Sequence, residues 1–132
     1  MTNSNLIQEY SKNPPNKFKM EDFTVNHFDE SRLCGDTLEV FLKIENNKIL
    51  DFSFIGETSI ITTACASIFG ESIIGLDISE ILKFDFDYIK NLVGDISPRR
   101  KYGATLGILA THNAIHKYLK DGITEDFSDV IE

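Results

Sequence analysis

The chain has 132 residues, of which 42% are apolar, and a formal net charge of −8. This length suits one ordinary core, and the acidic balance argues against nucleic acid or anionic lipid as partners, because both need clustered positive charge. The apolar stretches are far shorter than the ~20 residues that span a bilayer, and the N-terminal segment lacks the regions of a signal peptide. We therefore expect a cytoplasmic protein that binds neither nucleic acid nor membrane.

The first part of the chain predicts two short elements. Residues 5–11, NLIQEYS, favour a short helix, and the Pro-Pro pair at 14–15 ends any helix and forces an extended segment. Residues 22–29, DFTVNHFD, alternate between two sides of an extended chain. We interpret them as a first strand.

A clear apolar alternation begins after Cys34. Over residues 37–45 every second side chain is apolar and the others are polar, apart from Phe41, which predicts a strand with one wet face. Asn46 and Asn47 tolerate the positive φ of a tight hairpin turn, after which a second alternation begins. The apolar positions of the two strands are Leu38, Val40, Leu42, Ile44, Leu50, Phe52 and Phe54.

Helical patterns follow the hairpin. Ser59 is a suitable N-cap for a helix whose small residues at 64–67 allow close approach to another backbone. Asp77 is placed to cap a short helix, Gly94 closes the next one, and residues 104–120 form the longest helical pattern.

This order of elements predicts an α+β fold, a small three-stranded antiparallel sheet with helices packed on one face. We expect one domain over residues 1–121. The acidic segment 122–132 is predicted to be a flexible tail.

The stretch CGDTLEV, which starts at Cys34, has a second interpretation besides the entrance to a strand. In a reducing cytosol Cys34 and Cys65 are free thiols, metal ligands or packing residues. A thiolate and a carboxylate on either side of a flexible glycine, as in Cys34 and Asp36, can point at one ion. A closed tetrahedral site needs four ligands, so this spacing by itself favours a loop cysteine beside a strand.

Four spaced segments give the chain a specific resemblance. NPPNKF precedes CGD, and FIGETSIITTACAS and SPRRKYGATLGILATHNAI follow it. In this order and at these distances the chain resembles the scaffold family of iron–sulfur cluster assembly, which comprises the IscU, NifU N-terminal and SufU proteins. The resemblance covers the chain from about Tyr10 to Leu119.

Matched residue by residue, the resemblance implies a degenerate site. Cys34 falls on the first family cysteine, and Asp36 on the aspartate that in the family ligates metal or tunes cluster release. Ser59 and Gly103 stand where the family has its second and third cysteines. The implied cofactor is an iron–sulfur cluster, zinc or iron, with Cys34 and Asp36 as the remaining ligands, or no cofactor at all. Neither a serine hydroxyl nor a glycine replaces a thiolate ligand.

Other titratable side chains are weaker candidates. Cys65 lies on the small-residue helix and is expected in the core. His112 and His116 have a spacing that allows a shared metal, but we favour a packed His112 and an exposed His116. By analogy with the family, four further side chains are expected near the site: His27, Glu57, Lys101 and Tyr102.

The resemblance also implies a partner, a cysteine desulfurase of the NifS, IscS or SufS type, with Cys34 as the motif cysteine left to accept sulfur. The dense positive patch of Arg99, Arg100 and Lys101 is either a solvated loop or a docking surface for an acidic partner.

We expect a scaffold-like protein, monomeric or weakly dimeric, and not an enzyme, because no nucleophile–base pair or phosphate loop appears. The alternative is a regulatory or adaptor module that binds the desulfurase without carrying metal or cluster.

Overall fold

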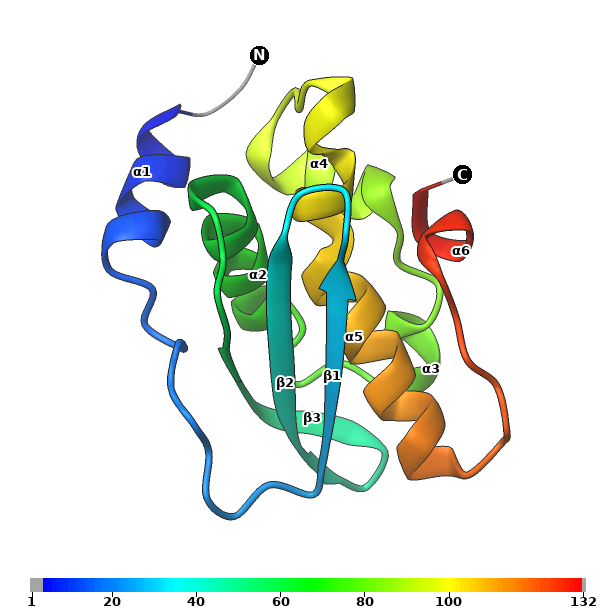
Figure 1. The fold of residues 1–132 in the computed structure, drawn as a ribbon. Coiled ribbons are helices and arrows are strands. Elements are labelled where there is room, and N and C mark those ends of the chain that lie inside the picture. The colour runs from blue at the N-terminus through cyan, green and yellow to red at the C-terminus, as the bar shows by residue number, and fades with distance from the viewer. Residues whose placement is uncertain (1–3, 132) are drawn as a thin grey trace.

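The computed structural model describes residues 4–131 and shows a three-stranded antiparallel sheet in the order β1-β2-β3, with helices α2 and α5 on one face (Figure 1). This arrangement confirms the predicted α+β fold. None of the helices within the described residues combines the length and the apolar character needed to cross a membrane. The elements are α1 Ser4–Lys12, β1 Val25–Ser31, β2 Asp36–Glu45, β3 Lys48–Ile55, α2 Ile60–Ser72, α3 Ile78–Ile81, α4 Phe86–Val93, a 3-10 turn Pro98–Arg100, α5 Lys101–Leu119 and α6 Phe127–Ile131.

The sheet is a meander whose first strand lies slightly later than its pattern suggested. β1 starts at Val25 rather than at residue 22 and runs to Ser31, which pairs with Asp36 at the tip of the β1–β2 hairpin. Asn46 and Asn47 adopt φ values of 54° and 61° in the turn between β2 and β3. The expected tight hairpin turn is therefore confirmed.

One prediction for β3 is wrong because the register shifts. A bulge between Lys43 and Ile44 brings Ile44 opposite Ile49, so that Ile49 rather than Leu50 faces the core. Ile49 is 1% exposed and Leu50 is 52% exposed. A shift of one residue exchanges the two faces of a strand, and sequence alternation alone could not place it.

The alternation predicts that the face of β2 opposite the core is exposed to solvent, but this face is covered at Phe41. Phe41 is buried, and its ring lies 5.2 Å from that of Phe23 in the segment that precedes β1. Met20, from the same segment, is buried as well. The chain between α1 and β1 thus covers part of the sheet face opposite the helices.

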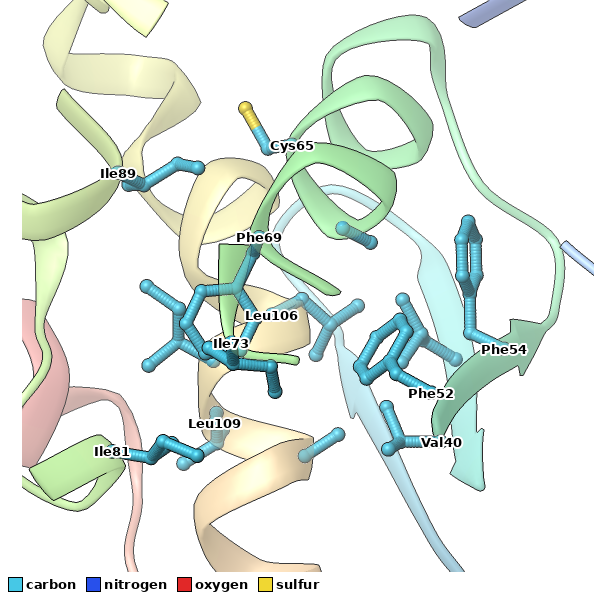
Figure 2. Close-up of a cluster of buried hydrophobic side chains, with 14 of the residues drawn as sticks. Val40, Phe52, Phe54, Cys65, Phe69, Ile73, Ile81, Ile89, Leu106 and Leu109 are labelled. Atoms are coloured by element: carbon cyan, nitrogen blue, oxygen red, sulfur yellow. The ribbon is translucent and has the colours of Figure 1, made fainter. Parts of the chain in front are cut away.

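The core lies between the sheet and helices α2 and α5 (Figure 2). The small residues of α2 permit the predicted close approach: a Cβ built on Gly107 of α5 would lie 3.1 Å from the Cα of Ala66. Cys65 is fully buried within this core, as expected, and burial raises the pKa of its thiol to about 12. Cys65 is therefore an inert packing residue.

The capping predictions for the shorter helices are confirmed. Asp77 accepts a hydrogen bond from the backbone N–H of Ser79 at the start of α3, and Gly94 ends α4 with φ of 90°. α5 starts at Lys101, three residues before the predicted boundary, because the 3-10 turn that begins at Pro98 leads directly into it.

The acidic C-terminal segment differs most from its prediction, because residues 121–131 pack back along α5 instead of fraying. Glu125 contacts both histidines of α5: its Oε1 lies 2.8 Å from Nδ1 of His112, and its Oε2 lies 2.6 Å from Nε2 of His116. The side chain of Asn113 holds the backbone N–H and C=O of Glu125. Val130 of α6 is fully buried.

His116 is therefore buried, and its predicted exposure is wrong. It is 6% exposed, and its Nδ1 lies 2.7 Å from Oδ2 of Asp121. Burial lowers the pKa of His116, but the hydrogen bonds and charges of Asp121 and Glu125 outweigh it, so that the pKa lies above its ordinary value near 6.5. Burial raises the pKa of Glu125, yet His112 and His116 together lower it more.

This network makes stability depend on pH. Because the folded pKa of His116 exceeds its unfolded value near 6.5, its contribution is complete below that pH and is lost as pH rises through the folded pKa. We expect His116→Gln to lower the free energy of unfolding by roughly 1–3 kcal/mol at about pH 6 and by less at about pH 9. Urea unfolding of both proteins measures the difference, with His27→Gln as a histidine control. A difference that stays constant between the two pH values would contradict this assignment.

Candidate functional site

Three segments that are distant in sequence meet at one end of the molecule: the tip of the β1–β2 hairpin, the start of α2 and the start of α5 (Figure 1). Between them lies a cleft of about 320 Å³. The structure therefore brings together the cysteine, the aspartate, the two replaced positions and two of the three basic residues. The cleft is lined by Cys34, Asp36, Ser59, Ile61, Arg99, Arg100 and Gly103.

Asp36 is the centre of this end of the molecule. It is 4% exposed, and both carboxylate oxygens accept hydrogen bonds from the first turn of α2. Oδ1 accepts from the backbone N–H of Ser59 at 2.9 Å, and Oδ2 accepts from the hydroxyls of Thr62 at 2.5 Å and Ser59 at 3.3 Å. The carboxylate also lies at the positive end of the α2 dipole, where negative charge is stabilised.

Local sequence features bring these groups into contact. Gly56 has φ of 148°, and a Cβ there would lie 2.1 Å from the backbone oxygen of Thr37, so that only glycine lets the chain leave β3 this close to β2. The backbone N–H of Thr37 then donates to the carbonyl of Glu57. This contact fixes residues 57–59 beside Asp36. Ser59 is the N-cap of α2 by position, as predicted, but its hydroxyl bonds side chains rather than the helix backbone.

Cys34 is exposed, in contrast to the buried Cys65. Its side chain lies on the exposed hairpin tip, where Sγ is 3.0 Å from the hydroxyl of Ser31. Gly35, in the left-handed region with φ of 72°, turns the chain between Cys34 and Asp36. The result is an accessible thiol at the edge of the cleft and a buried carboxylate two residues later.

The three basic residues of the patch have two different environments. Arg99 and Arg100 are exposed and line the cleft, and among residues 4–131 neither forms an ion pair with an acidic side chain. Lys101 instead places its ammonium group 5.1 Å from the centroid of the Phe86 ring. The two arginines are therefore the part of the patch that is available at the cleft.

Besides Lys101, three residues are expected near the site by analogy, and one of them, His27, lies away from the cleft. His27 lies beside Asp29, near the other end of α5, where it lines a pocket with His116. Tyr102 packs edge-on against Phe127 of α6, and Glu57 contributes its backbone carbonyl to Thr37.

Thr62 is the site residue that sequence analysis missed. It is fully buried, and its hydroxyl makes the shortest hydrogen bond to Asp36. Its position three residues after the N-cap Ser59 is one where polar side chains serve helix starts, and that spacing was the available signal.

The donor set does not fit an iron–sulfur cluster or a zinc ion held by this chain alone. One accessible thiol is present, the neighbouring carboxylate is occupied by three protein donors, and the two remaining positions carry a hydroxyl and no side chain. Within the described residues, His, Cys, Asp and Glu side chains form no group of three or more that is placed to hold a metal. Soft metals and clusters need thiolates, so Cys34 with Asp36 is at most half of a site.

Solved structures of other proteins share this fold. A NifU-like protein (N-terminal) from Brucella abortus superimposes with a TM-score of 0.72 at 18% identity, covering 89% of this chain and 94% of the other. A candidate iron–sulfur cluster assembly scaffold protein for the SUF system from Fervidobacterium islandicum also gives 0.72 at 23% identity, covering 83% and 93%. The architecture is therefore that of the NifU-like and SufU-type proteins.

Sequence comparison identifies the family. The model of the NifU-like N terminal domain matches residues 2–124, so this chain belongs to that family. The iron–sulfur cluster assembly scaffold protein IscU of Thermotoga maritima is 33% identical over 81 residues, which span 61% of this chain and 57% of that protein. IscU 1 of Archaeoglobus fulgidus is 26% identical over 117 residues, 89% of this chain and 76% of the relative. The resemblance seen in the motifs is confirmed.

Substitution of the two retained motif residues should change the free energy of unfolding by different amounts. We expect Asp36→Ala to lower the free energy of unfolding by roughly 1–3 kcal/mol, because it removes an acceptor from buried donors. Cys34→Ala should change it by less than about 0.5 kcal/mol, because the side chain is exposed. Urea unfolding at neutral pH measures both. Equal losses in the two variants would show that Asp36 has no special structural role.

Proposed function

We propose that this chain works in cytoplasmic iron–sulfur cluster assembly as a scaffold-like protein rather than an enzyme, and that Cys34 accepts sulfur from a cysteine desulfurase. The observation that supports this role most directly is the contrast between the two thiols, since Cys34 is exposed at the cleft and Cys65 is sealed in the core. Family membership supplies the context, because curated relatives of this chain are iron–sulfur cluster assembly scaffold proteins.

The chemistry at Cys34 is a sulfur transfer between thiols. The Cys34 thiolate attacks the terminal sulfur of a persulfide on the desulfurase, a new S–S bond forms on Cys34, and the S–S bond of the donor breaks to release its thiolate. The step consumes no oxidant or reductant. It needs an accessible thiol, and the exposed hairpin tip offers one.

The two arginines at the cleft are suited to contact with an acidic partner. Arg99 and Arg100 give the cleft local positive charge on a chain with a net charge of −8. Positive charge at the cleft attracts an acidic partner surface. We assign these two residues to contact with the desulfurase, with Lys101 as a supporting contact at its edge.

Iron, zinc or a cluster is the cargo of a scaffold protein, and here Cys34 would contribute one ligand, whereas Asp36 would contribute another only by giving up its hydrogen bonds to Ser59 and Thr62. The remaining thiolates would come from a second subunit or from the desulfurase. In the adaptor alternative the chain binds the desulfurase without receiving sulfur. The same fold supports both roles, and they differ only in whether Cys34 accepts sulfur.

Sulfur transfer gives a direct test. Incubation of the full chain with a cysteine desulfurase and cysteine should place a persulfide on Cys34, detected by alkylation and mass spectrometry. Cys34→Ser should abolish this modification, because serine offers no thiol, whereas Cys65→Ala should retain it. Binding to the desulfurase without any modification of Cys34 would instead favour the adaptor role.

Charge reversal at the cleft tests the partner contact. We expect Arg99→Glu combined with Arg100→Glu to weaken binding to the desulfurase by at least roughly tenfold, about 1.4 kcal/mol, as measured by calorimetry at low salt. The control is Lys19→Glu with Lys83→Glu, which changes the net charge equally at exposed positions away from the cleft. Equal weakening by both pairs would indicate a non-specific charge effect and contradict the assignment.

A further inference from the structure

The start of α5 leaves no room for a side chain at the third motif position. A Cβ built on Gly103 would lie 2.6 Å from Oγ1 of Thr62, 3.3 Å from Cγ2 of Ile61 and 3.7 Å from Oδ2 of Asp36. The first of these distances is shorter than real contacts between a Cβ and another heavy atom. The Thr62 hydroxyl therefore fills the space that any side chain at position 103 would need.

The same hydroxyl also engages the carboxylate. Thr62 Oγ1 donates to Oδ2 of Asp36 at 2.5 Å and lies 3.1 Å from the hydroxyl of Ser59. Because Thr62 is fully buried, this hydrogen bond has no competition from water, and its loss would leave Oδ2 of Asp36 with only the longer hydrogen bond from Ser59. One hydroxyl thus touches three of the four motif positions: Asp36, Ser59 and Gly103.

We propose that Thr62 closes this site to metal ions, and that the absence of the two cysteines is only part of the reason. Restoring thiols at positions 59 and 103 would not by itself rebuild a metal site, since Thr62 still blocks position 103 and still holds Asp36. Removing the Thr62 hydroxyl frees both the volume beside Gly103 and one oxygen of Asp36. This inference does not depend on sulfur transfer at Cys34.

Zinc binding provides the test. We compare the double variant Ser59→Cys, Gly103→Cys with the same variant carrying Thr62→Ala, using competition with a chromophoric chelator. The Thr62→Ala variant should bind one zinc ion roughly 10–100-fold more tightly than the double variant. Thr63→Ala in the same background is the matched control, because Thr63 is also buried on α2 and makes a 2.5 Å hydrogen bond, but to Thr58.

One further variant separates the effect of the Thr62 hydroxyl from a general loosening of the structure. Thr62→Ser keeps the hydroxyl and should leave zinc binding as weak as in the double variant. Equal zinc affinity with Thr62, with Thr62→Ser and with Thr62→Ala would overturn the proposal. So would equal gains from Thr62→Ala and Thr63→Ala, or no zinc binding in any of these proteins.

A metal-free measurement covers the case in which the variants with introduced cysteines do not fold. Gly103→Ala should lower the thermal midpoint of the otherwise native chain, although alanine is normally the better helix former. In a Thr62→Ala background the same change should raise the midpoint or leave it unchanged, because the clash is gone. Additive effects of the two substitutions would show that Thr62 does not occupy the space beside Gly103.

Discussion

The functional end of this protein depends on one buried carboxylate. Asp36 lies at the tip of the β1–β2 hairpin, and its hydrogen bonds with Ser59 and Thr62 connect this hairpin to the start of α2. Gly103, at the start of α5, packs directly against this contact. Burial of a carboxylate without partners would be costly, but the helix dipole and three donors compensate it here. The buried Asp36 carboxylate thus fixes the positions of the β1–β2 hairpin, the start of α2 and the start of α5 relative to one another.

That geometry explains how a member of the NifU-like N terminal domain family keeps its fold with Ser59 and Gly103 at the positions where the resemblance implies cysteines. Together with Thr62, these two residues fit around Asp36, so the structure needs no metal to satisfy the carboxylate. Cys34 is not part of this hydrogen-bonded arrangement with α2. It remains exposed at the hairpin tip, where it lines the cleft together with Arg99 and Arg100.

Sequence patterns predicted the element order, the hairpin turn, the caps of α3 and α4 and the burial of Cys65, because these depend on local chemistry and on helical or strand periodicity. They failed at Leu50 and Phe41, where a bulge and a covering segment decide which face is buried. They also missed the burial of His116 and the role of Thr62. Both depend on partners distant in sequence, Glu125 for the histidine and Asp36 for the threonine, and no local spacing reveals which segment will return to meet them.

The central claim is that this chain retains the scaffold fold but does not hold a metal or cluster with its own ligands. The most direct measurement is the content of iron, zinc and acid-labile sulfide in protein purified without oxygen, beside Cys34→Ala and Asp36→Ala variants. The account predicts far less than one metal ion per chain in the unaltered protein, with no further loss in either variant. Stoichiometric metal in the monomeric protein that disappears in both variants would contradict it, because Cys34 and Asp36 would then be ligands of a working site within one chain.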